Sequence, residues 1–300
     1  MAVTVATDIF SQEAYGGAVT GVAFASVPML AIPGLVTTVE PGNNVGGDTI
    51  TFSHWNTSLT GITQPSVRTA RAGVTPSKVS LADYQEAAVS KTISIDIDSM
   101  TQDDSAESVR GHIAEITGAE FGRTLQDLLI ANAINATTGT TLALDITAQT
   151  LKTMNVDSIL EARLKWGDHA GEFNQPYLFM HSAQFTSLAK SSDYKTLAGG
   201  GNTALVRGVD DWSRFVVGQV HGVNLCLLDN AQLIDASTPN KYTALMVAPG
   251  AFGAFIGTIP SPTVIRHPGS TVVTIDSHLR IATTLYRHAP RRVVKLVTHI

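Results

Sequence analysis

Charged residues are scarce in this chain of 300 residues. Asp, Glu, Lys and Arg make up 15% of it, against about 25% in an average soluble protein, while hydrophobic residues make up 44%. A soluble subunit that works alone needs charge on its outside. The composition therefore predicts that other subunits cover much of the surface. The length is enough for one large domain or two modest ones.

Cysteine and early basic residues are also nearly missing. The single cysteine, Cys226, excludes an intrachain disulfide framework and is typical of a reducing cytoplasm. No Lys or Arg precedes Arg68, so the sequence indicates neither a secretory signal nor a transit peptide. Residues 14–39 carry no charge, but prolines and glycines interrupt them. This pattern favours an ordered, irregular arm over a membrane-spanning helix.

Common catalytic and ligand-binding motifs are absent as well. The sequence has no G-x-S-x-G elbow, no Walker loop, no G-x-G-x-x-G after a strand and no H-x-x-x-H pattern. The glycines at 199–201 lack a following Lys-Ser/Thr pair, which favours a mobile loop. Cys226 lies in an apolar run, and Asp96 and Asp98 have no further ligands at a metal-loop spacing. We therefore predict a buried, inert thiol, solvent-facing strand acids, and no metal or cofactor.

The stretch 39–55, VEPGNNVGGDTITFSHW, begins with turn signals and continues as a strand. Ile50, Phe52 and His54 would face one side of this strand. Residues 56–73 are polar and loop-like, and residues 74–81 are expected to form the returning strand. Because an isolated two-stranded hairpin is marginally stable in water, we expect this one to pack against a neighbouring copy of the chain.

A strand and then a long helix are expected next. Apolar residues alternate between Val79 and Ile97, most regularly in TISIDID, which predicts a strand with one buried face. Over 101–135, apolar residues recur at steps of three and four, which predicts a helix. Gly118 and Gly122 each cost about 1 kcal/mol relative to Ala in a helix interior. We therefore expect another backbone to cross closely at these two glycines.

Residues 138–257 are typical of a separate α/β unit. We expect a helix at 147–166, a buried strand in PYLFM, a second helix from Ser182, a strand pair in VVGQVHGVNLCLLDN with Gly222 near its turn, and a strand in YTALMVAP. The C-terminal stretch returns to a strand pattern. The predicted fold class is therefore α+β.

Charge is unevenly distributed along the chain. Residues 1–67 carry only acids, whereas Arg287, Arg291, Arg292 and Lys295 cluster near the C-terminus. Intrachain pairing or a solvated face is the simpler explanation, and head-to-tail attraction between neighbouring copies is the alternative. Four cations in a chain with a formal net charge of −5 do not form the basic stripe that nucleic-acid binding requires.

The order of these parts resembles the major capsid proteins of tailed bacteriophages with the Hong Kong 97-type coat fold. The resemblance begins with an arm, a turn-rich lead into GDTITF, and a long excursion that returns through VTPSKVSLADYQEAAVSKTISIDID directly into one long helix. It continues in YLFMHSAQFTSLAK, VVGQVHGVNLCLLDN and VAPGAFGAFIG, and so spans nearly the whole chain.

The resemblance implies how the chain is divided. It implies an N-terminal arm at 1–38, an extended loop at 39–81, a discontinuous peripheral domain at 82–137 and 258–300, and an inserted axial domain at 138–257. Strand 87–98 would form a sheet with the C-terminal strands. The helix at 101–135 would be the spine helix, and its expected packing residues are Val109, Ile113, Ile116, Gly118, Gly122 and Leu125.

The resemblance also implies a function without catalysis. Hexamers and pentamers of the chain would assemble in the host cytoplasm into the icosahedral shell of a virion, around double-stranded DNA that is not bound by sequence, and without a membrane. Phe52, Trp55, Arg68 and Arg71 would contact a neighbour through the extended loop. Scaffolding, portal and decoration proteins would be separate chains. No lysine lies between Thr49 and Ser77, so the isopeptide cross-link of some relatives is expected to be absent.

Other functions fit parts of the sequence. An encapsulin-type nanocompartment would share the fold but enclose an enzyme. A cytoplasmic hydrolase built on residues 138–257 would need His181, Asp193 and either Ser191 or Ser192 to meet in one cleft. A tail-tube protein or an adhesin is disfavoured, because such proteins are mostly β and this chain is expected to contain a 35-residue helix.

Overall fold

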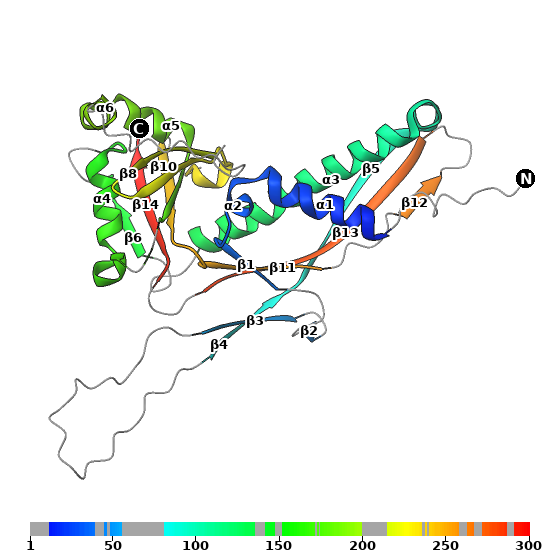
Figure 1. The fold of residues 1–300 in the computed structure, drawn as a ribbon, viewed down its shortest axis with the longest axis horizontal. Coiled ribbons are helices and arrows are strands. Elements are labelled where there is room, and N and C mark those ends of the chain that lie inside the picture. Colours follow the sequence, from blue (N-terminus) through cyan, green and yellow to red (C-terminus); the bar gives the residue numbers. More distant parts are fainter. Residues whose placement is uncertain are drawn as a thin grey trace, which may run out of the picture.

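The computed structural model describes residues 12–39, 45–46, 49–55, 81–135, 142–147, 152–171, 173, 175–199, 215–235, 238, 240–257, 263–266, 272–286 and 291–300. They form a mixed α and β structure with an elongated outline (Figure 1). A compact lobe lies at one end of a long diagonal helix. A strand pair lies below the middle of the molecule.

The described residues contain helices and strands in the following order. The helices are α1 (Gln12–Ser26), α2 (Pro28–Ala31), α3 (Ser99–Ile134), α4 (Val156–Leu164), α5 (Ser182–Lys190) and α6 (Ser192–Gly199), with short 3-10 helices at Gly167–Gly171 and Ala231–Leu233. The strands are β1 (Val36–Val39), β2 (Val45–Gly46), β3 (Thr49–Trp55), β4 (Leu81–Ala87), β5 (Val89–Asp98), β6 (Leu142–Asp145), β7 (Tyr177–Met180), β8 (Val216–Val220), β9 (Val223–Leu227), β10 (Lys241–Val247), β11 (Phe252–Ile256), β12 (Thr263–Arg266), β13 (Val272–Leu285) and β14 (Val293–His299). The predicted long helix and the strand at 49–55 are both confirmed.

A five-stranded sheet occupies the centre of the molecule. Its strands follow the order β1-β11-β13-β12, and β5 pairs antiparallel with β13. Successive side chains of a strand point to opposite faces of a sheet. On β13, Ile275, Leu279 and Leu285 belong to the core that includes the helices. Ala282 and, just after the strand, Tyr286 pack with β3 instead. The end of β13 is therefore buried on both faces.

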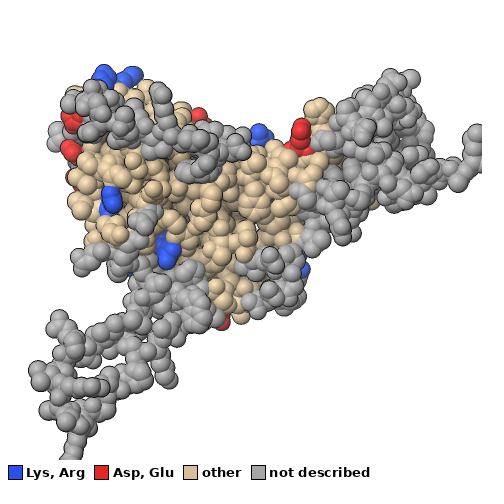
Figure 2. All heavy atoms as spheres, viewed as in Figure 1, with Lys and Arg blue, Asp and Glu red and all other residues tan. Residues whose placement is uncertain are grey.

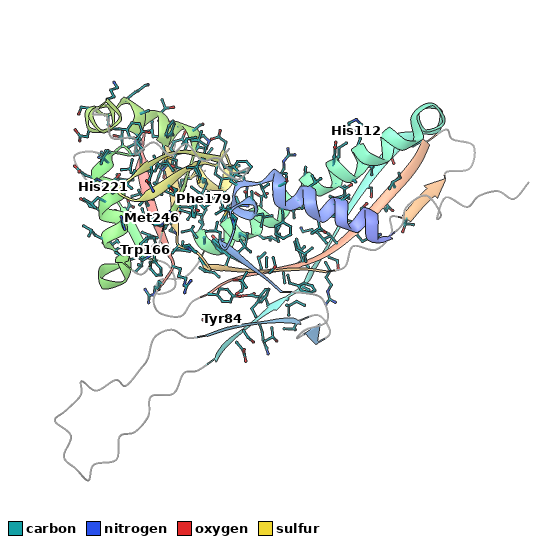
Figure 3. All side chains as sticks on the ribbon, viewed as in Figure 1. Tyr84, His112, Trp166, Phe179, His221 and Met246 are labelled. Carbon is teal, nitrogen blue, oxygen red and sulfur yellow. The ribbon has the colours of Figure 1, made fainter. Side chains whose placement is uncertain are left out.

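A six-stranded sheet forms the compact lobe, in the order β6-β14-β10-β7-β9-β8. Strand β7 is buried along its whole length, and the predicted helix after it begins at Ser182. Phe179 and Met246 lie inside this lobe (Figure 3). Gly222 joins β8 to β9 with a φ of 74°, a left-handed conformation that glycine adopts at little cost. The predicted strands in this region are confirmed. The helix predicted at 147–166 is shorter and spans Val156–Leu164.

The strand pairing differs from the predicted division of the chain in two places. Strand β14 was expected to join the sheet of strand 87–98, but it lies between β6 and β10 in the six-stranded sheet. Strand β11 was expected to belong to the 138–257 unit, but it pairs with β1 and β13 in the five-stranded sheet. Periodicity reveals a strand but not its partner, because pairing is decided by contacts between distant segments.

The region between 79 and 97 is not one strand, as the alternation suggested, but two. Strand β4 pairs with β3, and β5 pairs with β13, so the chain changes sheets at Ala88. The buried face changes there as well: Tyr84 is partly buried on β4, whereas Ile93 and Ile95 are partly buried on β5. Val89 lies just after the switch and is exposed. Residues 74–80, predicted to begin the returning strand, lie outside the described residues.

The N-terminal part is helical where an irregular arm was expected. Helix α1 contains two adjacent glycines and few long side chains, so its own propensity is modest. Packing against α3 supplies the missing stability, and Val19 and Ala23 are buried in that contact. None of the helices in the described parts of the chain is long and apolar enough to cross a membrane.

The two glycines of α3 allow α1 to lie against it. A Cβ atom on Gly118 would lie 2.7 Å from the carbonyl oxygen of Val19, and one on Gly122 would lie 2.6 Å from the carbonyl oxygen of Ala23. Backbone atoms cannot move aside as the end of a flexible side chain can. The prediction that another backbone crosses at these positions is confirmed, and the partner is α1.

Replacing Gly118 with Val should therefore separate α1 from α3. We expect the free energy of unfolding to fall by about 2–3 kcal/mol, the usual effect of overpacking. Gly21 is the matched control, because it lies on α1 with no atom within 4 Å of its missing Cβ. Gly21→Ala should be neutral or stabilising by up to about 1 kcal/mol. Urea unfolding measures both, and equal effects would contradict the close crossing.

Candidate assembly surfaces

The base of the β3–β4 hairpin packs on the chain's own five-stranded sheet. Ile50 and Phe52 are fully buried, in a cluster with Phe255, Ala282 and Tyr286. The predicted orientation of β3 is thus confirmed, but the predicted partner is not. Phe52 was expected to contact a neighbouring subunit, and that prediction is wrong for its side chain, because the subunit's own sheet buries it. Nothing local in the sequence indicates this contact, because Phe255 and Tyr286 lie more than 200 positions away from Phe52.

Polar and aromatic contacts hold the same hairpin base in place. The rings of Tyr84 and Tyr286 meet edge to face, with centroids 5.7 Å apart. The hydroxyl of Thr284 donates to Glu86 at 3.2 Å, and Ser53 donates to Asp83 across the hairpin at 2.5 Å. Burial, and secondarily the neighbouring Tyr84, raises the pKa of Tyr286 to about 12. Tyr286 is therefore neutral at physiological pH, as its place in an apolar cluster requires.

The other predicted contacts of the hairpin lie beyond this base. Trp55 is the last residue of β3 and pairs with Leu81 of β4 through the backbone. Its side chain, and all of Arg68 and Arg71, lie outside the described residues. The structure therefore shows where the chain leaves the hairpin base, after Trp55 and before Leu81, and both points lie on the same face of the five-stranded sheet as Phe52.

A polar face continues along the same side of the sheet, beyond the hairpin base. Residues 90, 92, 94 and 96 of β5 lie opposite residues 280, 278, 276 and 274 of β13. The hydroxyl of Thr274 donates to Asp96 at 2.6 Å, and Thr92 and His278 share a hydrogen bond of 2.9 Å. Asp96 is exposed, as predicted for a solvent-facing strand acid. The four β5 residues and His278 are exposed, whereas Thr274, Asp276 and Arg280 are partly buried. We call these eight residues the open polar face.

The outer edge of β5 is also open within the described residues. Over its ten residues, β5 pairs there with β13 alone. Val89 is 44% exposed, and Lys91 is exposed near the start of the strand. A long strand edge with free N–H and C=O groups is a template for pairing with another chain. Sequence periodicity could not identify it, because an edge strand and an inner strand can show the same alternation.

Helix α3 is fastened to both sheets near its C-terminal end. The side-chain amide of Asn132 donates to the carbonyl oxygen of Thr283 at 3.1 Å and to its hydroxyl at 2.9 Å. Lys295 of β14 donates to the carbonyl oxygen of Ile134 at 2.7 Å. A cation at this end of a helix also complements the helix dipole. These contacts join α3 to β13 in one sheet and to β14 in the other.

The predicted packing residues of α3 do not all point the same way. Ile113, Gly118, Gly122 and Leu125 are buried. Ile116 is 56% exposed, so its side chain does not pack in the core of the described residues, and its predicted packing role stays a prediction. Position 116 lies about 160° around the helix from Gly118, at 100° per residue, and thus opposite α1. The side chain of Val109 lies outside the described ones.

The basic cluster near the C-terminus is used within the chain where the structure describes it. The guanidinium of Arg292 donates to the carbonyl oxygen of Pro249 at 2.5 Å and lies 5.8 Å from the centroid of the Phe173 ring. Lys295 binds the end of α3. Intrachain contacts, the simpler explanation, therefore hold for these two residues. Figure 2 shows that few charged side chains lie on the visible face of the described part of the molecule.

The residues of the alternative hydrolase site are not brought together. His181 precedes α5 and accepts a hydrogen bond from the backbone of Ala183, whereas Ser191 follows the helix and donates to Leu188. The nine residues of α5 separate them by about 13 Å at 1.5 Å per residue. Ser192 donates to Asp193 at 3.1 Å. Nε2 of His181 lies 3.6 Å from Asp229, which is not one of the residues of the alternative site. Among the described residues, no group of three or more His, Cys, Asp or Glu could hold a metal ion.

The thiol of Cys226 is buried, as predicted, and burial raises its pKa to about 12. The native thiol should therefore react with a disulfide reagent between pH 7 and 9 at least about a thousandfold more slowly than in the unfolded chain, because the reactive species is the thiolate. Absorbance assays with and without denaturant measure this ratio. Native labelling at the rate of a free thiol would contradict the burial of Cys226.

The comparisons with known proteins bear on the fold. No protein-family model matches the sequence, and no curated protein matches it. The structure is similar to the capsid of Ralstonia phage GP4, with a TM-score of 0.66 and 13% sequence identity over 88% of this chain and 87% of that one. It is also similar to the acidic stable capsid of Helicobacter pylori bacteriophage KHP30, with a TM-score of 0.58 and 11% identity over 88% of both chains.

A third similar structure is a virus-like particle from Pyrococcus furiosus, with a TM-score of 0.52 and 12% identity over 95% of this chain and 98% of that one. Each match covers 87% or more of both chains. At such low identity the likeness concerns the fold. The chain therefore has the mixed α and β fold of phage capsid proteins.

Proposed function

We propose that this chain is the major capsid protein of a tailed bacteriophage and assembles into the icosahedral shell of its head. The observation that carries this proposal is the similarity to capsid structures over 88% of the chain. A fold alone does not define a function. The open edge of β5, the open polar face and the 15% of charged residues add support, because each leaves surface that further copies can cover.

In this proposal the chain has the Hong Kong 97-type arrangement. Helix α3 is the spine helix, the five-stranded sheet with α3 is the peripheral domain, and the six-stranded sheet is the axial domain. Strand β14 then belongs to the axial domain and β11 to the peripheral domain, as their pairing requires. Residues 1–38 form the N-terminal arm, and the extended loop leaves from the β3–β4 base.

The proposed contacts lie on the extended loop and on the sheet of a neighbour. Residues 56–80 carry three cations, at Arg68, Arg71 and Lys78, and no acid. We propose that Trp55, Arg68 and Arg71 contact the open polar face of the next subunit, where Asp96 is exposed. Many such modest contacts, repeated by symmetry, close a shell although each contributes little.

The shell would enclose double-stranded DNA without reading its sequence and without catalysis, metal or cofactor. The formal net charge of −5 suits a wall that need not bind DNA tightly. Hexamers and pentamers would form the lattice in the host cytoplasm. Scaffolding, portal and decoration functions would belong to separate chains. An encapsulin-type shell that encloses an enzyme is the second candidate, because it would share the same fold.

Electron microscopy of gently purified protein tests the proposal, combined with analysis of the contents after nuclease treatment of intact particles. We expect closed shells, or rings of five or six subunits, and protected DNA when the shells come from infected cells. Shells that hold a single enzyme would favour the second candidate. A monodisperse monomer that never assembles, even with the other head proteins, would contradict both candidates.

Replacing Arg68 and Arg71 together with Ala should weaken assembly. We expect at least a tenfold rise in the protein concentration needed for shells, because two charged contacts are lost in every copy. Light scattering against concentration measures this value. The control is the double replacement with Lys, which keeps both charges and should retain most of the assembly. Equal behaviour of the Ala and wild-type proteins would contradict the proposed contact.

The shell should lack covalent links between subunits. No lysine lies between residues 49 and 77, so the extended loop offers no amine for an isopeptide bond until Lys78 at its base. Denaturing electrophoresis of purified particles should give a single band at 31.7 kDa. A ladder of multiples that persists under reducing conditions would show that such links form.

A further inference from the structure

On the face that carries the hairpin, the five-stranded sheet has a gap above Gly253, where a side chain is missing. We call this gap the hole. A Cβ atom on Gly253 of β11 would lie 2.8 Å from Cδ1 of Phe52, 2.8 Å from the hydroxyl oxygen of Tyr286 and 2.9 Å from Cγ2 of Thr284. These contacts are too short for any side chain to fit. The φ of Gly253 is not positive, so the backbone conformation does not require a glycine. The space does.

The ring of Phe52 fills this hole. Neighbouring residues of β11 point to the other face, where Phe252 and Ala254 belong to the core that includes the helices. Gly253 and Phe255 therefore face β3. Phe52 is fully buried there, and the edge-to-face pair of Tyr84 and Tyr286 lies in the same cluster. The large side chain of Phe52 thus occupies a space that a side chain at position 253 would otherwise fill.

The position of Phe52 within the hairpin allows this contact to influence the direction of the residues that follow. Two cross-strand pairs, Ile50 with Glu86 and Phe52 with Tyr84, face the sheet in the described hairpin. Of these, the pair with Phe52 lies nearer to the point where residues 56–80 leave. Half of these 25 residues, about 12, can span at most about 40 Å at the rise of a strand. A small rotation at the last anchored pair thus becomes a large displacement at the far end.

We propose that Phe52 and Gly253 are positioning residues for assembly. They fix the direction in which residues 56–80 leave the subunit, and they act on the neighbouring copy through that segment, without touching the neighbour themselves. This inference rests on the proposed function for its assembly readout, but the orientation of the hairpin base can be measured on single subunits.

Two substitutions and their combination separate positioning from plain stability. Phe52→Leu makes the side chain that fills the hole smaller, and Gly253→Ala places a methyl group in the hole. Each should raise amide hydrogen exchange in residues 49–55 and 81–87 of unassembled subunits at least tenfold, while exchange in residues 272–281 stays unchanged. Each should also raise the concentration needed for shells at least tenfold. The double variant combines a smaller side chain at position 52 with a methyl group at position 253. It relieves the contact with Phe52 but not those with Tyr286 and Thr284, so it should recover part of both losses.

The matched control is Phe179→Leu, which removes similar volume from a fully buried position on β7, in the core that includes the helices and away from the hairpin. At an equal loss of melting temperature, the control should assemble normally. The proposal is overturned if Phe52→Leu assembles as well as this control, or if exchange rises equally in all strands. If the wild-type chain forms no shell, the proposed function fails, and hydrogen exchange in the subunits still decides whether Phe52 and Gly253 fix the hairpin.

Discussion

The rest of this structure depends on one strand, β13, which must bury both of its faces at one end. Ile281 and Leu285 pack into the core that contains α1 and α3, and Ala282 packs under the hairpin on the opposite face. A strand with two buried faces needs partners on both sides of its sheet. The helices supply one partner, and the base of β3 and β4 supplies the other. Further along β13, the second face is covered less: His278 is exposed, whereas Thr274, Asp276 and Arg280 are partly buried.

Helix α3 extends this constraint to the second sheet. Asn132 holds the C-terminal part of α3 to β13, and Lys295 holds the end of α3 to β14. Asn230, in the segment after β9, donates a hydrogen bond of 2.5 Å to Asp127 of α3. The close approach of α1 at Gly118 and Gly122 holds the middle of the helix. The two sheets thus share one helix as a common support. A subunit built in this way can present its hairpin and its open surfaces in a fixed relation to each other.

The sequence predicts local structure well and long-range packing poorly. The long helix, β3, β7, the β8–β9 pair and the close crossing at Gly118 follow from periodicity, turn chemistry and the cost of glycine within a helix. The burial of Phe52 against Tyr286 does not, because nothing local links residues so far apart. The sheets to which β11 and β14 belong were predicted wrongly for the same reason. The helical arm was not predicted because its stability comes from packing against α3. The exposure of Ile116 was not predicted because regular spacing does not show on which side of a helix its packing partner lies.

A cryo-electron microscopy reconstruction of the purified assembly would show whether this chain is a shell subunit with a self-docked hairpin base and an open face for the next copy. We expect closed shells in which Phe52 fills the space at Gly253 of its own subunit while residues 56–80 cover the open polar face of a neighbour. Shells in which Phe52 inserts into another copy, or in which the open polar face remains in contact with solvent, would contradict this expectation.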